Sequence, residues 1–345
     1  MQPGCRCLSA ECQRATSAAS SRTAAQRQQQ RAALILHGMS ARSDGQRHLD
    51  ADSFATLRRD WMETNPDFAF DVYFHSWTGA HEAEVVRIIQ PKRWAFEAPK
   101  RDEDFFDFAA LSAALQTAAR PLKLSDTTTN ISPEAMAARL FARFHSLARS
   151  VQLVGPAIDG YDAVLLSRFD VVSRTPLNLS ALDLSPPPPP PPVGAPSAAS
   201  LPSRPGEARL YTPLFSQQLV LEDASATCSR PDGQCSVYLD GAKVPLEDFK
   251  QQVQQGVFSF GVHDFFLVGS AAAARKMAAA ADELAGYLAP GSDFLGGGWR
   301  WPVVLSGHSV VAYHARQQGI ELRRLPLEEH VDFALPRSVR SSGWV

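Results

Sequence analysis

A charged tripeptide, Arg168-Phe169-Asp170, interrupts an apolar segment of this 345-residue chain. The apolar run 163–166 precedes the tripeptide, and Val171-Val172 follows it at once. A carboxylate offers hard oxygen ligands to a divalent cation, and a guanidinium binds phosphate groups. Two interpretations stay open from these residues alone. Either they form a ligand-binding edge, or Arg168 and Asp170 end a strand and pair with each other or with loop backbone.

Small residues and a cation follow a second apolar run, at residues 32–37. They are Gly38, Ser40 and Arg42. A glycine at this position lets the backbone approach a ligand closely. Arg42 is either part of such a loop or a solvated surface arginine.

A third candidate group is His263-Asp264, which lies between Gly261 and Phe265 in an aromatic segment that we interpret as strand. A carboxylate or an imidazole there can act as a general base toward a hydroxyl group. A structural cap on a loop is the alternative. We interpret His75, at the end of the run 70–77, as a core histidine rather than a catalyst.

The spacing of apolar residues predicts the elements that must position these groups. Strands are expected at 32–37 and 70–77, with a helix over 53–62 between them, and this order favours a parallel sheet. Ser132-Pro133-Glu134 is typical of a helix start, and the helix leads into a buried strand at 163–166. Open α/β sheets bind ligands at the carboxyl ends of their strands, so the candidate groups should meet at one edge.

The last third of the chain predicts an aromatic strand pair within 257–270, an Ala-rich helix over 271–288, a helix over 310–318 ending at Gly319, and a strand at 320–325. A serine hydrolase is set aside. Gly307-His308-Ser309 lacks the second glycine of a nucleophile elbow, because Val311 stands there, and His330 precedes Asp332 in the wrong order.

Composition excludes several classes of protein. Hydrophobic residues make up 45% and charged residues 20%, with a formal net charge of −2. This balance is ordinary for a globular domain and argues against a nucleic-acid partner. No apolar run approaches the roughly 18 residues of a membrane span, and the first thirty residues lack the apolar core of a secretory signal. Localisation stays open between a secretory lumen and the cytoplasm.

The predicted organisation is a single α/β domain over residues 32–335, between a disordered tail at 1–31 and a short tail at 336–345. Seven consecutive prolines at 186–192 predict a flexible Pro-rich insertion over 183–206. Cys228 and Cys235 flank a turn-forming sequence, and they are either bridged or two free thiols.

Six segments, taken in order, resemble a family of GT-A-like glycosyltransferases of microbial, algal and large-virus type, whose hallmark is a Tyr-Asp strand ending in R-x-D. The segments are LILHGMSAR, FDVYFHSW, FARFHSLARSV, YDAVLLSRFDVV, VHDFFLVGS and GHSVVAYHARQQGI. The resemblance covers about residues 32–325, apart from the Pro-rich insertion and the acidic middle.

This resemblance implies a Rossmann-like domain that transfers a sugar from a nucleotide-sugar donor to a hydroxyl of a carbohydrate acceptor. Five residues would bind the donor: Gly38, Ser40, Arg42, Arg168 and Asp170. Asp170 would ligate Mg²⁺ or Mn²⁺ or bind donor hydroxyls, while Arg168 would face the diphosphate and make the metal partly dispensable. Asp264, with His263 as the second candidate, would be the general base.

Two other functions stay open. His308-Ser309 stands where the family pattern has Pro-Glu at a helix start, which favours a catalytically inactive relative that binds a sugar or a protein. A nucleotidyltransferase-like enzyme on the same sheet is the other alternative.

Overall fold

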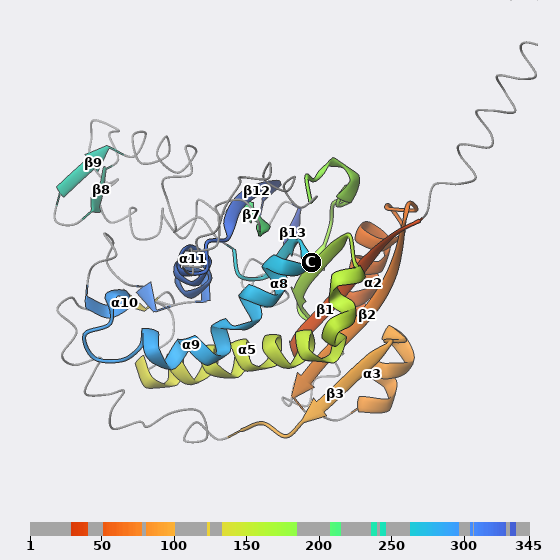
Figure 1. The fold of residues 1–345 in the computed structure, drawn as a ribbon, viewed down its shortest axis with the longest axis horizontal. Helices are drawn as coiled ribbons and strands as arrows, with labels where there is room; N and C mark the ends of the chain where they lie inside the picture. Colours follow the sequence, from red (N-terminus) through yellow and green to blue (C-terminus); the bar gives the residue numbers. More distant parts are fainter. Residues whose placement is uncertain are drawn as a thin grey trace, which may run out of the picture.

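A seven-stranded, mostly parallel sheet forms the centre of the molecule, with strand order β12-β7-β10-β5-β1-β2-β3 (Figure 1). The computed structural model describes residues 29–40, 51–77, 81–100, 123–124, 133–184, 208–214, 236–239, 242–245, 263–296, 304–305, 307–328 and 332–335. Arg42, Cys228 and Cys235, almost all of the predicted tails and most of the Pro-rich insertion lie outside these residues. The predicted domain limits stay predictions.

Four strands make the parallel half of the sheet, and they confirm the expected strand, helix, strand order. They are β1 (Gln30–Met39), β2 (Phe68–Trp77), β3 (Arg93–Glu97) and β5 (Ala163–Arg168). β1 pairs in parallel with both β2 and β5, and β2 pairs in parallel with β3. The carboxyl ends of all four therefore lie on one edge.

The other half of the sheet contains β7 (Arg209–Leu214), β10 (Phe266–Gly269) and β12 (Glu321–Glu328). β12 and β7 are parallel, whereas β10 is antiparallel to both β5 and β7. The start of β10 therefore faces the edge at which β5 ends. His263 and Asp264 precede β10 instead of lying within a strand, which corrects the sequence prediction, and 257–262 lie outside the described residues.

Helices cover both faces of the sheet (Figure 1). One face carries α2 (Ala51–Leu57), which continues as a π-helical turn (Arg58–Met62), and α3 (Glu82–Ile89). The other carries α5 (Pro133–Val154), α8 (Ala271–Ala278), α9 (Ala280–Tyr287), α10 (Asp293–Gly296) and α11 (Gly307–Gln317). Alternation along β1 divides the core, because Ala33 and Ile35 face α5 while Leu34 and Leu36 face α2.

Two helices differ from the sequence prediction. The Ala-rich segment is interrupted at Ala279, so it forms α8 and α9 instead of one helix. α11 starts at Gly307, three residues earlier than expected, and Ser309 is buried in its first turn. Gly319 follows the helix with φ 61°, a conformation that favours glycine.

Short elements complete the described chain. Three two-stranded sheets pair β4 (Lys123–Leu124) with β11 (Val304–Leu305), β6 (Val172–Ser173) with β13 (Phe333–Ala334), and β8 (Ser236–Leu239) with β9 (Ala242–Pro245). Two 3₁₀ segments span Gly155–Gly160 and Leu179–Ala181. No helix among the described residues is long and apolar enough to cross a membrane.

The Tyr-Asp pair that precedes β5 fastens the opposite, amino edge of the sheet. The Tyr161 hydroxyl donates to Asp71 at 2.5 Å, and the backbone N–H of Arg31 donates to Asp162 at 2.7 Å. Lys92 also donates to Asp71, at 2.8 Å. The Tyr-Asp pair is therefore structural, because it ties the starts of β1, β2 and β5 together.

Candidate functional site

Side chains from three neighbouring strands meet at the carboxyl edge of the sheet. His37 of β1 is in register with His75 of β2 on one side and with Arg168 of β5 on the other. The backbone N–H of Arg168 donates to the carbonyl of Phe265 at 3.0 Å, which brings the segment before β10 to the same place. The described residues of all three predicted groups therefore lie at this one edge of the sheet.

Arg168 and Asp170 bind each other. The Arg168 Nε donates to Asp170 Oδ1 at 2.7 Å, and a guanidinium nitrogen contacts Oδ2. The two side chains are 17% and 12% exposed, and Phe169 between them is buried against Phe74. The structure contains the mutual pair that was one of the two alternatives left open by the sequence, and this pair lies at the carboxyl edge of the sheet.

The side-chain oxygens and nitrogens of the residues described at this edge do not form a set of ligands that fits a resident divalent cation. Both carboxylate oxygens of Asp170 contact the guanidinium of Arg168. Within the described part of the chain, no group of three or more His, Cys, Asp or Glu side chains could hold a metal ion. We therefore derive no chemical step through a metal.

Asp264 lies in a clamp formed by two helices. Arg143 of α5 contacts both the carboxylate and the backbone carbonyl of Asp264. Gly307 at the start of α11 leaves the room for this contact, because a Cβ there would lie 1.7 Å from Asp264 Oδ2 and 2.6 Å from an Arg143 nitrogen. His308 Nδ1 accepts the backbone N–H of Asp264 at 3.2 Å and lies 3.3 Å from Oδ1.

The electrostatics of the clamp keep Asp264 ionised. The side chain is 3% exposed, and burial acts to raise its pKa. Nearby positive charge, first of all on Arg143 and also on Arg168, outweighs burial and holds the pKa of Asp264 below its ordinary value. Burial also lowers the pKa of Arg143, to about 10, so the guanidinium stays charged at neutral pH.

His263 occupies an aromatic environment. Its ring is fully buried, with ring centroids 5.1 Å from Phe265 and 5.5 Å from both His308 and Phe333. Its carbonyl accepts the Thr212 hydroxyl at 3.2 Å. The His263 ring is therefore packed in the core next to Asp264.

The end of β1 and the residue that follows it, Gly38 to Ser40, lie at the same edge of the sheet. Gly38 has φ 108°, and its N–H donates to Ser146 Oγ at 2.8 Å. No atom of the described residues lies within 4 Å of the position that a Cβ would take there. Ser40 is buried, and its N–H donates to Ser76 Oγ at 3.0 Å.

The sequence prediction missed Arg143 and His37 as members of this site. Arg143 has a signal in the sequence, because it falls three residues after Leu140 and four before Leu147, on the buried face of an otherwise apolar stripe. His37 is 3% exposed. Burial, then the charges on Arg143 and Arg168, hold the pKa of His37 well below its ordinary value.

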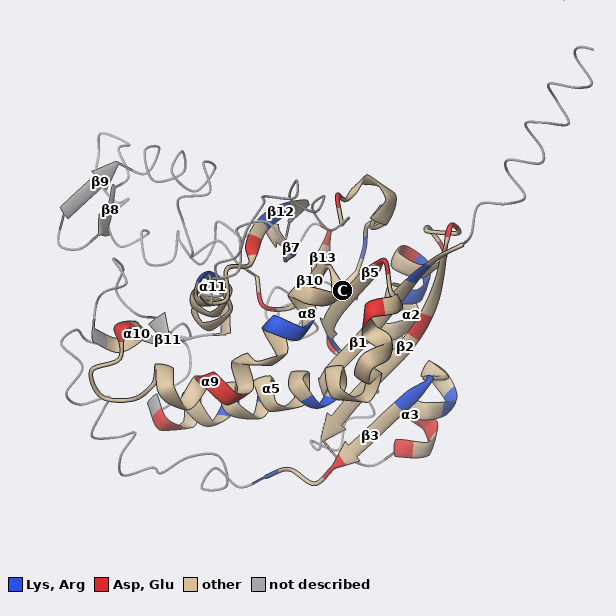
Figure 2. Cartoon of the chain, viewed as in Figure 1, with Lys and Arg blue, Asp and Glu red and all other residues tan. Residues whose placement is uncertain are grey.

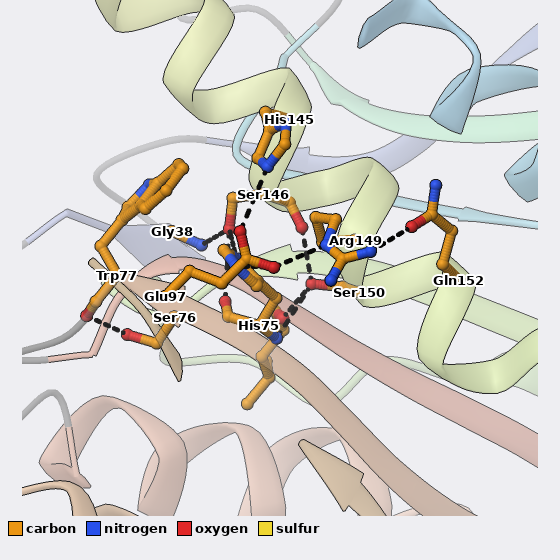
Figure 3. A network of polar contacts seen from close by, with 11 residues as sticks. Gly38, His75, Ser76, Trp77, Glu97, His145, Ser146, Arg149, Ser150 and Gln152 are labelled. Carbon is orange, nitrogen blue, oxygen red and sulfur yellow. Dashed lines mark hydrogen bonds and ion pairs between the residues drawn. The ribbon is translucent and has the colours of Figure 1, made fainter. Parts of the chain in front are cut away.

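A second polar cluster adjoins the first, at the end of β3 (Figure 3). Glu97 accepts from Arg149 Nε at 2.6 Å and lies 3.4 Å from His145 Nε2 and 3.6 Å from His75 Nε2. Trp77 stacks on His145 with ring centroids 5.6 Å apart. The sequence prediction missed Glu97, His145 and Arg149, because only the packing of α5 against β3 brings them together.

His75 has the structural role expected of a core histidine. It is fully buried, its Nδ1 lies 2.8 Å from Ser146 Oγ, and its backbone N–H donates to Ser150 Oγ at 3.0 Å. Burial lowers the pKa of His75 to about 4, so the ring is neutral at physiological pH. The two serines of α5 thus fasten the helix to the ends of β1 and β2.

Comparisons with known proteins give matches to solved structures alone. No family model matches the chain, and no curated protein matches it. Mouse xyloside xylosyltransferase 1, in its apo form, aligns over 89% of this chain and 96% of its own, with 9% identity and a TM-score of 0.37.

Two further solved structures align with the chain. The bifunctional glycosyltransferase WbbM aligns over 85% of this chain at 11% identity and a TM-score of 0.31, and the match spans 38% of WbbM. The mannosyltransferase Ktr4p from S. cerevisiae aligns over 84% of this chain and 68% of its own, at 10% identity and a TM-score of 0.33. Neither activity nor residue roles are inferred from likeness of this degree.

Proposed function

We propose that the chain is a glycosyltransferase of GT-A type, which moves a sugar from a nucleotide-sugar donor to a hydroxyl group of a carbohydrate acceptor. One observation carries the proposal. Two buried or half-buried arginines, Arg143 and Arg168, and two carboxylates, Asp170 and Asp264, gather at the carboxyl edge of a parallel sheet. The open backbone at Gly38 adjoins them.

The arrangement suits the charges of such a reaction. The acceptor oxygen bonds to the anomeric carbon as the bond from that carbon to the diphosphate oxygen breaks, and the bonding electrons leave with the nucleoside diphosphate. Arg168 faces the departing diphosphate, whose growing charge a fixed cation stabilises. The acceptor proton passes to Asp264, which is ionised at neutral pH, and His263 supports the position of Asp264 from behind.

Asp170 holds donor hydroxyls in this proposal. A carboxylate has about four lone-pair sites, so Asp170 can accept bonds from sugar or ribose hydroxyls while it stays paired with Arg168. Gly38 and Ser40 lie beside the donor's nucleoside, and Arg42, which follows them in the sequence, is assigned to the same part of the donor. Since no metal is needed for these contacts, we expect turnover to persist in excess EDTA; loss of turnover that Mg²⁺ or Mn²⁺ restores would contradict this expectation.

A second candidate function is a catalytically inactive sugar- or protein-binding domain. It is favoured by the fact that arginines already engage both Asp170 and Asp264, together with the 3% exposure of the Asp264 side chain. Such a protein would bind a donor without cleaving it. A nucleotidyltransferase would instead release pyrophosphate from a nucleoside triphosphate and a sugar phosphate.

The decisive measurement is release of nucleoside diphosphate from a panel of nucleotide sugars, with and without acceptor glycans. We expect one donor to be turned over, and Asp170→Ala to lose roughly 100-fold or more of the rate. Asp159→Ala is the matched control, because Asp159 is an exposed carboxylate that pairs with Arg275 on the surface. Donor binding without turnover would favour the inactive domain, and an active Asp170→Ala enzyme would remove Asp170 from the site.

A further inference from the structure

A cavity that the proposed chemistry does not use lies beside the second polar cluster. Its volume is about 400 Å³, within the range of roughly 300–1,000 Å³ that small-molecule sites occupy. It is bounded by the end of β3, the outer side of α5 and the start of α9. Its polar lining residues are Glu97, Lys100, His145, Arg149, Gln152 and Asp282, and Ala148 and Ala281 add small apolar surfaces.

The polar groups of one wall are held in place before any ligand arrives. Arg149 donates to Glu97 Oε1 at 2.6 Å and to Gln152 Oε1 at 2.8 Å. The amide nitrogen of Gln152 points away from Arg149 (Figure 3). The wall therefore offers fixed hydrogen-bond donors, and α9 contributes the Asp282 carboxylate as an acceptor. Groups held in this way lose little entropy when a ligand binds.

Among the described residues of the lining, the charges cancel. Glu97 and Asp282 carry one negative charge each, and Lys100 and Arg149 carry one positive charge each. A phosphate or another strong anion is bound best by an excess of cations, which the described lining residues do not provide. A ligand rich in hydroxyl groups uses donors and acceptors equally, and small apolar surfaces such as Ala148 and Ala281 suit the C–H face of a sugar ring.

We infer that this cavity binds a neutral sugar unit of a glycan. The assignment of the bound sugar to the acceptor rests on the proposed transferase function. α5 contributes both Arg143 at the clamp and Arg149 at the cavity; six residues separate them, about 9 Å along the helix axis and roughly 240° around it. The bound unit therefore belongs to a part of the acceptor that is remote from its reactive hydroxyl.

Ligand-observed NMR tests the inference. Neutral trisaccharides of glucose, galactose and mannose are added to the full chain without a nucleotide-sugar donor, and their binding is measured. We expect at least one trisaccharide to bind, and Ala281→Trp, which fills the cavity, to abolish its binding while the circular dichroism spectrum is unchanged. Asp282→Asn should weaken binding about tenfold, the effect of losing one hydrogen bond to a charged group. Glu283→Gln, on the neighbouring exposed acid of α9, should not change it.

Three results would overturn the inference: no neutral trisaccharide binds, binding survives Ala281→Trp, or trigalacturonic acid binds more tightly than every neutral probe. Failure of the proposed function is distinguishable, because these measurements need no donor. If trisaccharides bind at the cavity and no nucleotide sugar is turned over, the carbohydrate site stands and the transferase activity does not.

Discussion

At the scale of single residues, the site consists of carboxylates that arginines already hold. Arg168 engages both oxygens of Asp170, and Arg143 engages Asp264 by its carboxylate and its carbonyl. The second pair is the more buried, with side chains 17% and 3% exposed. Removing one member of such a pair is costly, because the remaining charge is left buried without compensation.

We therefore expect Arg143→Gln to lower the free energy of unfolding by roughly 3–5 kcal/mol. Adding Asp264→Asn should recover part of this loss, because the uncompensated carboxylate is then gone. Urea unfolding of the two single variants and the double variant measures the coupling. Arg149→Gln serves as the control on the same helix, since its ion pair is 44% and 25% exposed and should contribute at most about 1 kcal/mol. Strictly additive effects would contradict the clamp.

At the scale of elements, the sequence predicted most of the parallel sheet. The runs 32–37 and 163–166 are apolar on both faces, and the strand, helix, strand order fixes their direction. It could not predict that β10 runs antiparallel, because the pairing partner is set by packing far along the chain. For the same reason it missed the meeting of Glu97 with Arg149. It also missed Arg143, although a charge within an apolar helical stripe was a signal that could have identified this residue.

The start of α11 carries a prediction of its own. Gly307→Ala should disrupt the clamp, because the added Cβ would overlap Asp264 and Arg143. We expect a lower melting temperature and a loss of activity, measured by thermal unfolding and donor turnover. Gly286→Ala in α9 is the matched control. No atom in the described part of the chain lies within 4 Å of its Cβ position, so this change should leave activity unchanged and stabilise the helix by roughly 0.5–1 kcal/mol. Equal effects of the two changes would contradict the close approach at Gly307.

At the scale of the whole molecule, neutral buried histidines link stability to pH. Burial lowers the pKa values of His37, His75 and His314; the first two rings belong to β1 and β2 in the parallel half of the sheet, and the third belongs to α11. Charged residues lie mainly at element ends and on helices, while β1 and β5 are uncharged over most of their length (Figure 2). Protonation of the interior therefore favours the unfolded chain.

The expected pH dependence follows from the sign of the shift. The pKa of His75 falls from 6.5 in the unfolded chain to about 4 in the folded one. The contribution of the neutral His75 ring to the free energy of unfolding is therefore fully present above pH 6.5, and it is lost as pH falls toward 4. Between pH 7 and pH 5 the loss is about 2 kcal/mol. Urea unfolding at both pH values should show this loss, and His75→Gln should reduce it.

His81→Asn provides the control for this pH effect. His81 has a 49% exposed side chain, and asparagine accepts its left-handed backbone, φ 80°. This variant should keep the wild-type pH dependence of the free energy of unfolding. A His75→Gln protein with the same pH dependence as His81→Asn would show that His75 is not the group responsible.

The late position of β10 in the sequence leaves one edge of β5 without its partner during synthesis. β1, β2, β3, β5 and α5 are all encoded before residue 170, whereas Asp264 and Gly307 follow after a further long stretch of chain. At roughly 5–20 residues per second on the ribosome, β5 waits several seconds with an unpaired edge before β10 emerges. Such an edge is a template for pairing with another chain. A nascent chain stalled before residue 264 would therefore keep this edge of β5 open to pairing with another chain.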